Sequence, residues 1–434
     1  MPLFEEVSLE LLNWMERIMQ MRRLMAFWLC WQTSWALAQA PLAATSPTYS
    51  VPELVRTVLA FNPALNQAQL GQAQAQAALQ TAQALPNPRL EWSGGRAQAP
   101  LNSAQGAVSS WGASQLLENP QVREARSAIA REGVAYQKVQ VLQTQRDVIA
   151  HVRQLAYEVV LRQEEVQAAS EGLILLEQTQ DRVRLRVNSG EAPRYEIIKA
   201  DAEAIHARQR QQTAQLALEQ TRIRLNQLAA GQLPAGWRLR ASLEDALPIL
   251  DRDTLRREVR SENAELKALR TEVERQRARV REAQASRWPG VEIRYAQTRE
   301  PEVRQGMVGA SIQMPLLDQR QGPLAEARAE LLRAQARLES RETELTLQLD
   351  AAWSALEMAR LRVDSLGSGA IREAEAALRV SEAAYRFGER GILDVLDAQR
   401  VLRSVRADLL LARFQLQAAA IEIDVLTGRE LAQP

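Results

Sequence analysis

The sequence predicts a mainly α-helical fold with a small β part, whose strands have the length needed to cross a membrane. Three observations support this prediction. Ala, Gln, Arg, Leu and Glu dominate the composition and only 5% of residues are aromatic, which suits long helices and coiled coils better than one thick core. The chain repeats itself once. Each half contains two short segments in which apolar and polar residues alternate.

An internal duplication sets the domain organisation. Ala-Gln-Ala at residue 82 recurs at residue 283, a shift of 201, and Glu-Ala-Arg at residue 124 recurs at residue 326, a shift of 202. Gly190-Glu191 recurs as Gly388-Glu389, a shift of 198. These shifts are nearly constant and far too long for a solenoid repeat. They indicate two copies of one architecture.

The N-terminus is typical of a secretory signal peptide. Met21-Arg22-Arg23 provides a charged start, an apolar run follows over residues 24–37, and Ala36-Leu37-Ala38 provides a small-x-small cleavage pattern. The run is shorter than the roughly 20 residues that a spanning helix needs. We expect cleavage after Ala38, with residues 1–20 as a dispensable extension. The only cysteine, Cys30, lies in this segment, so the mature protein would contain none.

Each half is expected to contain a helix, two strands and a long helical hairpin. Val291, Ile293 and Tyr295 alternate with polar neighbours, as in a strand with one apolar face. The expected segments are a leader over 1–38, a linker over 39–50, a first repeat over 51–235, a linker over 236–251, a second repeat over 252–428 and a tail over 429–434. Strands are expected at about 88–97, 107–117, 289–299 and 306–315, and hairpins at 120–229 and 322–427.

These elements need neighbouring copies. A helix of more than 60 residues reaches roughly 100 Å, and a monomer of this size cannot cover two such hairpins. Four strands have open edges and cannot stand in lipid alone, because their free backbone groups would find no hydrogen-bond partner. Shared among three copies, they would give a barrel of 12 strands. The pattern favours a conduit in which a helical tube continues from a membrane barrel.

Four motifs, in order on the duplicated frame, show a family resemblance: Asn62-Pro63-Ala64-Leu65, Leu85–Leu90, Asp318–Gly322 with Ala325–Arg328, and Tyr385–Gln399. From Val51 to Gly428 the chain resembles the TolC-like outer-membrane efflux proteins, and among them the outer-membrane component of cobalt–zinc–cadmium-type heavy-metal efflux systems. The resemblance implies a homotrimer with a 12-stranded barrel in the outer membrane of a Gram-negative bacterium and an α-helical barrel in the periplasm.

The resemblance also implies partners and cargo. A periplasmic membrane-fusion adaptor and a proton-driven inner-membrane pump of the resistance-nodulation-division type would complete a tripartite pump, with heavy-metal cations as cargo. Two alternatives stay open. One is an outer-membrane duct for organic toxicants or drugs. The other is a periplasmic coiled-coil adaptor, which would usually carry a β-rich lipoyl-like module beside one hairpin, whereas this chain has two hairpins and four strands.

Two carboxylates form the candidate channel aperture. Asp394 and Asp397 follow the glycine turn of the second hairpin, and their spacing of three residues places them on one face of a helix. They match the family's Asp-Val-Leu-Asp-Ala motif, whose aspartates line the narrow periplasmic end of the tube. Six carboxylates from three chains would concentrate cations there. The alternative is that they only favour the first turn of the helix through its dipole.

The candidate tip latch consists of Tyr385, Arg390 and Glu196. Tyr385 and Arg390 match the family pattern Tyr-x-x-Gly-x-Arg, and Glu196 occupies in the first half the place of Asp394 in the second. A hydroxyl and a guanidinium could hold a carboxylate of the neighbouring hairpin. The alternative is ordinary solvated charge.

The hairpin turns are the expected adaptor contacts. They are marked by Gly190 and Pro193 in the first half and by Gly388 and Gly391 in the second. The first hairpin departs from the family pattern, because Pro193 and Arg194 replace small apolar residues.

The sequence offers little for an enzyme, a cofactor or nucleic-acid binding. Formal net charge is only +1, so no bulk attraction to nucleic acid is expected. The two histidines, His151 and His206, lack neighbours spaced for a metal site. No phosphate-binding loop and no Ser/His/Asp set is recognisable, so we expect a protein that is not an enzyme and binds no cofactor.

Overall fold

The computed structural model describes residues 47–97, 106–245, 247 and 251–429. The expected leader, most of the linker over 39–50 and all but the first residue of the tail lie outside the described residues. The chain divides into two units, one of residues 1–48 and 234–238, the other of residues 49–233 and 239–434. Every described helix and the larger sheet belong to the second unit.

The two repeats contain the same elements in the same order. The first holds α2 (Val51–Phe61), α3 (Pro63–Gln83), β2 (Arg89–Ala97), β3 (Gly106–Leu117), α4 (Pro120–Asn188) and α5 (Arg194–Leu228). The second holds α6 (Arg252–Glu262), α7 (Ala264–Ala285), β5 (Val291–Arg299), β6 (Arg304–Ile312), α8 (Gln321–Ser365), a π-helical turn η1 (Leu366–Ala370), α9 (Ile371–Arg386) and α10 (Ile392–Thr427). β1 (Thr48–Tyr49) and β4 (Arg238–Leu239) form a separate two-stranded sheet.

The single helix expected before the strands is two helices in each repeat, joined at a buried asparagine. Asn62 and Asn263 have extended backbone (φ −68° and −58°) and cap the following helix through Oδ1, which accepts from Leu65 N at 3.1 Å and Leu266 N at 3.1 Å. Their Nδ2 groups donate to the last turns of α5 and α10, at Leu228 O (2.9 Å) and Leu426 O (3.0 Å) respectively. The duplication therefore extends to individual hydrogen bonds.

Strands β2, β3, β5 and β6 form one antiparallel sheet in sequence order. Trp92 lies opposite Trp111, Ala113 opposite Tyr295, and Tyr295 opposite Val308, so these side chains share one face. The Trp111 and Tyr295 rings meet edge to face at 5.5 Å. β6 ends at Ile312, short of the expected residue 315, where Pro315 has no N–H to donate.

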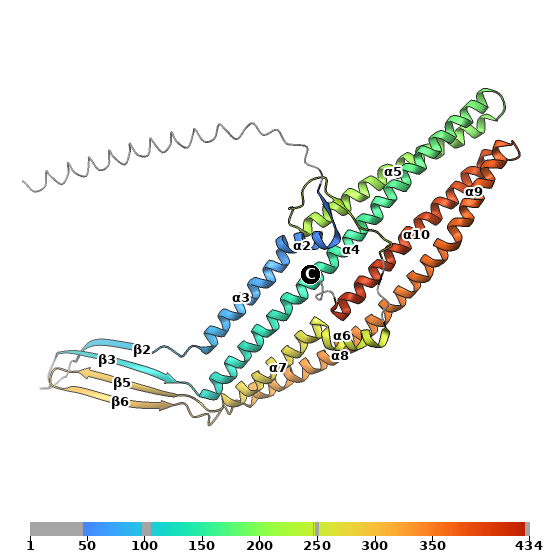
Figure 1. Cartoon of the computed structure of the whole chain (residues 1–434). Coiled ribbons are helices and arrows are strands. Elements are labelled where there is room, and N and C mark those ends of the chain that lie inside the picture. The colour runs from blue at the N-terminus through green and yellow to red at the C-terminus, as the bar shows by residue number, and fades with distance from the viewer. Residues whose placement is uncertain (1–46, 98–105, 246, 248–250, 430–434) are drawn as a thin grey trace, which may run out of the picture. The chain divides into compact units, whose positions relative to one another are not determined.

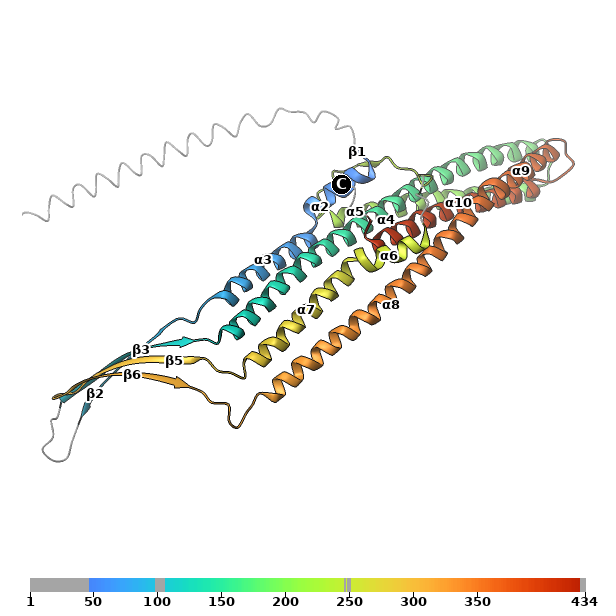
Figure 2. The same cartoon turned by 60° about the horizontal axis from the view of Figure 1, so that its bottom comes forward.

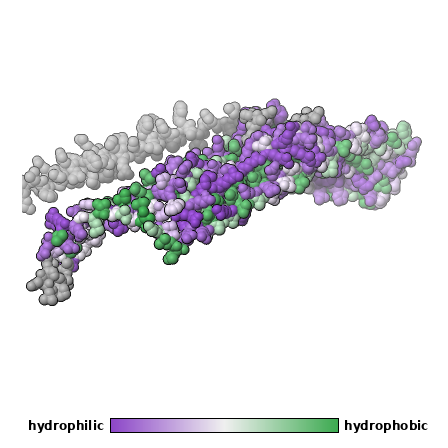
Figure 3. All heavy atoms as spheres, turned by 90° about the horizontal axis from the view of Figure 1, so that it is seen from below, coloured by the Kyte–Doolittle hydropathy of each residue, from purple (hydrophilic) through white to green (hydrophobic). Residues whose placement is uncertain are grey.

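The sheet has one apolar face, and nothing in the described part of the protomer covers it. Toward the helices this face consists of Leu90, Ala113, Leu117, Val291, Ile293, Tyr295, Val308, Ala310 and Ile312, with Gln115 as its one polar side chain, and Figure 3 shows apolar surface gathering at that end. Leu90 is 82% exposed and Val308 is 76% exposed. The opposite face bears mostly polar residues, Arg89, Glu91, Ser93, Ser114, Glu292, Arg294 and Ser311, together with Leu116, Ala296 and Met307. Such a sheet is suited to an apolar medium on one side and water on the other.

The helices pack side by side along the second unit, with the strands at one end and the two hairpin turns at the other (Figure 1). α4 lies against α3, α5 and α7, and α8 lies against α7 and α10, as Figures 1 and 2 agree. One apolar core joins α6, α7, α8 and α10 around Leu255, Leu266, Leu349 and Ile423. Among the described helices, none is long and apolar enough to cross a bilayer.

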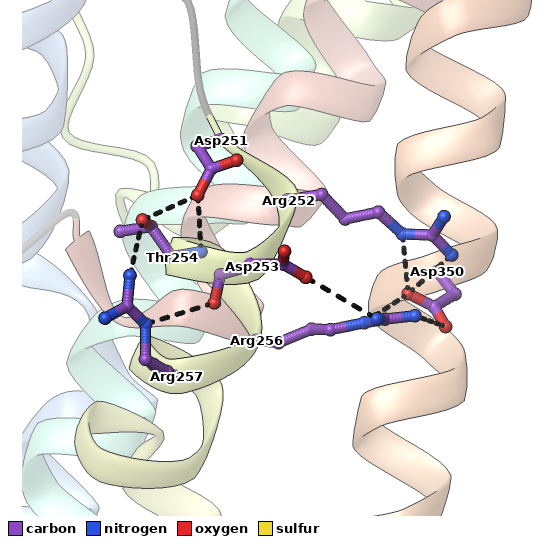
Figure 4. A network of polar contacts seen from close by, with 7 residues as sticks. All are labelled: Asp251, Arg252, Asp253, Thr254, Arg256, Arg257 and Asp350. Carbon is purple, nitrogen blue, oxygen red and sulfur yellow. Dashed lines mark hydrogen bonds and ion pairs between the residues drawn. The ribbon is translucent and has the colours of Figure 1, made fainter.

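A charged network fastens α6 to α8 (Figure 4). Arg256 donates two hydrogen bonds to the Asp350 carboxylate, at 3.1 and 2.8 Å, and Arg252 donates a third at 3.1 Å. Asp251 caps α6 by accepting from Thr254 N at 2.9 Å. The hydrogen bonds from Arg256, and then from Arg252, hold the pKa of Asp350 below its ordinary value.

Candidate functional site at the hairpin tips

The two hairpin turns have the same backbone geometry. Gly190 and Gly388 lie in the left-handed region (φ 82° and 75°), which favours glycine, and each donates to the carbonyl three residues before it. The next two amides in each turn both bond to one carbonyl, Arg186 O in the first turn and Ala384 O in the second, which lies five and six residues back. Pro193 and Gly391 both sit in extended backbone immediately before the return helix. The proline therefore does not alter the path of the first turn.

Each candidate aperture aspartate pairs with an arginine of its own hairpin. Asp394 lies in the first turn of α10, 3.5 Å from Arg390 Nη1, and Asp397 is hydrogen-bonded to Arg400. The aspartate side chains are 47% and 59% exposed. Exposed pairs of this kind contribute only about 0–1 kcal/mol and rearrange easily. Within the protomer, the two negative charges are balanced by two positive ones.

Among the described residues, the candidate latch residues Glu196, Tyr385 and Arg390 make no direct bond to one another. A Cβ built on Gly391 would lie 3.7 Å from Glu196 Oε1, so the glutamate stands beside the start of α10. Its Oε2 is buried and has no hydrogen-bond partner in the described part of the chain, and the same is true of Tyr385 Oη. Arg390 pairs instead with Asp394. Two buried oxygens at the tip are thus left for a further donor or acceptor.

Sequence reasoning missed Arg186. Its guanidinium lies 4.7 Å from the centroid of the Tyr385 ring, so a cation–π contact joins α4 of the first hairpin to α9 of the second. Arg186 also pairs with Glu191 of its own turn at 3.7 Å. The position 198 residues further on is Ala384, so the duplication carried no signal for this contact.

An apolar cluster supports the same junction. Tyr385, Ile392, Val395 and Leu396 of the second hairpin pack with four residues of the first, Leu176, Val183, Ala200 and Ala207. In the Asp-Val-Leu-Asp-Ala motif the two apolar residues therefore face the other hairpin, while the aspartates are exposed. The cluster gives the two hairpins of one protomer a shared core at their tips.

The first arm of the second hairpin, formed by α8, η1 and α9, contains an irregular turn that the sequence did not predict. In η1, Ile371 N bonds to Leu366 O five residues back, and Ser368 Oγ donates to Asp364 O at 2.6 Å. The equivalent arm, α4, is an unbroken helix of 69 residues. The available signal was the run Gly367-Ser368-Gly369, because glycine and serine pairs and π-bulges are common causes of helix bending.

The described residues offer no metal centre. Among them, no group of three or more His, Cys, Asp or Glu side chains is arranged to hold a metal ion. His151 lies on α4 and His206 on α5, and both are exposed.

Comparison with known proteins identifies the class. A sequence model of the outer membrane efflux protein family matches residues 54–231 and 255–429, the two repeats. The chain therefore belongs to this family. It is a TolC-like channel protein of the outer membrane that extends into the periplasm, and it is not an enzyme. The sequence predictions of family, fold class and location are confirmed.

One curated relative and several solved structures are similar to this chain. The cobalt-zinc-cadmium resistance protein CzcC of Cupriavidus metallidurans is 27% identical over 285 residues, which are 65% of this chain and 68% of that protein. The solved structure of CusC superposes with a TM-score of 0.77 at 18% identity, covering 87% of this chain and 91% of CusC. VceC of Vibrio cholerae gives 0.75 at 16% identity, covering 87% and 96%. The structural likenesses support the fold.

Proposed function

We propose that this protein is the outer-membrane duct of a tripartite, proton-driven efflux pump, and that three copies form the duct. The observation that carries this proposal is the sheet. Its apolar face is uncovered, and its two outer strands, β2 and β6, each have one edge without a partner among the described residues. Pairing β6 of one copy with β2 of the next would satisfy both edges. Three copies would close a barrel of 12 strands.

Heavy-metal cations are the proposed cargo. This rests on the resemblance to CzcC, whose name describes cobalt, zinc and cadmium resistance. A strain lacking the gene should become more sensitive to these metals and recover when the gene is restored. Sensitivity to organic dyes and detergents alone, with unchanged metal tolerance, would transfer the assignment to organic toxicants.

The partners follow from the same assignment. A periplasmic membrane-fusion adaptor is proposed to bind the turns at Gly190–Pro193 and Gly388–Gly391, and a resistance-nodulation-division pump would energise transport. Charge reversal in the turns, Glu191→Lys with Glu389→Lys, should reduce co-purification of the adaptor. Unreduced recovery of the adaptor would argue against docking at these turns.

Asp394 and Asp397 are proposed to set the charge of the aperture. Each aspartate balances an arginine, Arg390 or Arg400, so changing both aspartates to asparagine leaves two uncompensated guanidinium groups per chain. The channel should then shift toward anions in planar bilayers under a salt gradient. The converse pair of variants, Arg390→Gln and Arg400→Gln, should shift it toward cations.

A control separates the aperture from general surface charge. Asp408 is also an exposed aspartate of α10, further from the turn, and Asp408→Asn should leave the reversal potential where it is. The reversal potential could shift equally in Asp408→Asn and in the variant of both aspartates, or in neither. Either result would mean that Asp394 and Asp397 only favour the first turn of α10.

Glu196, Tyr385 and Arg390 are proposed to close the tips when three copies assemble. The buried, unpartnered oxygens of Glu196 and Tyr385 support this, because a neighbouring hairpin could supply the missing donor. Glu196→Gln and Arg390→Ala should each raise the resting conductance. Arg372→Ala, which removes an exposed arginine from α9, is the matched control. Resting conductance that does not differ from this control would count against the latch.

A further inference from the structure

A cavity of about 380 Å³ lies between the two hairpins, on the strand side of the tip cluster. This volume is at the lower end of the range for small-ligand sites. Helices α4, α5, α9 and α10 all contribute to the wall. Most of the wall is apolar and many side chains are small: Ala168, Ala169, Gly172, Leu175, Leu176, Ala207, Leu378, Leu402, Ala407 and Leu410. The small residues leave space where larger ones would have filled the packing between the helices.

A buried amide lines this cavity without a partner. Gln399 of α10 is 2% exposed, and both its Nε2 and its Oε1 lack a hydrogen-bond partner in the described part of the chain. Buried side-chain amides nearly always bond to protein or to an ordered molecule. A carboxamide offers one acceptor oxygen and two donor hydrogens, so a polar ligand group could satisfy it from either side.

Positive charge in the cavity is incompletely balanced. Arg403 makes one ion pair with a described residue, Glu203 at 3.9 Å, and Arg210 shares that carboxylate at 4.0 Å. Burial, together with the nearby Arg210, lowers the pKa of Arg403, which means that its charged form is poorly stabilised. Its aliphatic part packs on Gly172, whose added Cβ would lie 3.6 Å from Arg403 Cδ.

The carboxylates in the wall already have partners. Glu165 accepts from Arg162 at 2.7 Å, and Glu171 accepts from Gln167 at 3.0 Å. The third arginine, Arg406, is paired with Glu375 at 2.9 Å. Arg403 is the least exposed of the three wall arginines, at 28% against 50% for Arg210 and 48% for Arg406. It lies one turn along α10 from the unpartnered Gln399.

We propose that this cavity binds a small amphipathic organic anion, with a carboxylate or sulfonate head and a short hydrocarbon or aromatic body. The head would accept hydrogen bonds from the Arg403 guanidinium and from Gln399 Nε2. The body would lie against the alanine and leucine wall, where its apolar surface is removed from water. Because α4 and α10 both line the cavity, a bound anion contacts both hairpins. This site is separate from the aperture aspartates and does not depend on the proposed metal cargo.

The test uses three eight-carbon probes that differ in head group: octanoate, octanol and octylamine. Binding is measured by isothermal titration calorimetry on the full-length protein in lipid nanodiscs, with empty nanodiscs titrated to subtract partition into lipid. Octanoate should bind saturably, at one site per chain. Octanol should bind at least about tenfold more weakly, since it lacks the charge that Arg403 needs. Octylamine should give only the signal of the empty nanodiscs.

Variants separate the site from unspecific apolar binding. Arg403→Gln should weaken octanoate about tenfold, whereas Arg403→Lys should keep most of the affinity. Ala169→Leu with Ala407→Leu fills the cavity with apolar atoms and should abolish binding. Arg413→Gln, on the same helix and paired with Glu244 at 2.7 Å, is the matched control and should bind as the natural chain does. Circular dichroism and trimer size report that each variant is folded.

Three outcomes would overturn the proposal. One is octanoate heat no greater than in empty nanodiscs. Another is octanol binding as tightly as octanoate, which would indicate a plain apolar void. The third is octanoate affinity unchanged in both Arg403→Gln and the filled variant, which would indicate binding elsewhere on the protein.

Discussion

The π-helical turn η1 gives the sharpest prediction about motion of the second hairpin. η1 separates α8 from α9, and α9 has 16 residues before the turn that leads to Asp394. At 1.5 Å per residue, the hairpin turn lies about 24 Å beyond η1. A bend of about 10° at η1 would therefore move the turn by about 4 Å, enough to change the width of the aperture proposed at the hairpin tips.

Gly367 and Gly369 are not required there by packing. A Cβ on Gly369 would meet nothing within 4 Å, and one on Gly367 would come no closer than 4.0 Å to Leu409 Cδ1. Neither glycine has a positive φ, so alanine fits. Glycine inside a helix costs about 0.5–1 kcal/mol relative to alanine. The double variant Gly367→Ala/Gly369→Ala should therefore stabilise the helical form of this turn by about 1–2 kcal/mol per protomer.

The consequence is measurable in single-channel recordings. If opening disrupts the helical form of η1, stabilising that form by about 1–2 kcal/mol lowers the open fraction by a factor of about 5–30. The matched control is Gly133→Ala in the unbroken α4, where a Cβ also meets nothing within 4 Å. This control should stabilise its helix by a similar amount and leave the open fraction unchanged. The bend at η1 would be refuted if the double variant and the Gly133→Ala control changed the open fraction equally. It would also be refuted if neither changed it.

Three further predictions concern stability. Asn263→Ala removes the bond to Leu426 O and a helix cap, and should cost about 2–4 kcal/mol in thermal unfolding; a cost below about 0.5 kcal/mol would contradict this role. Asp350 has a lowered pKa, so it stabilises the fold above its unfolded-state pKa, near 3.8, and that stability is lost as pH falls through the lower folded value. Asp350→Asn should therefore reduce the loss of stability as the pH falls below about 4, and an unchanged pH profile would refute this. Arg186→Met and Tyr385→Leu should be non-additive by about 0.5–1 kcal/mol in a double-mutant cycle, whereas additive effects would show that the cation–π contact is energetically idle.

The sequence by itself determined the order of the strands and hairpins in each repeat, because these elements have local signatures, but it missed the break at Asn62 and Asn263 and the turn η1. Alternation over Val291–Tyr295 specifies a strand with one apolar face, and the glycines at 190 and 388 specify turns through a backbone conformation that other residues rarely adopt. The duplication added a second, independent copy of each signal. Resemblance of the motifs then supplied the family, which the comparison with known proteins confirmed.

Only the tertiary structure decided which side chains meet at the tips. Arg186 stacks on Tyr385 although the two are separated by almost half the chain, and Gln399 is buried although its neighbours Asp397 and Arg400 are exposed. These contacts depend on how faces of long helices are rotated against one another. Small departures from 3.6 residues per turn accumulate along α4 and α8, and a π-helical turn such as η1 shifts the register again. That rotation is a property of packing between distant segments, so no local pattern in the chain records it.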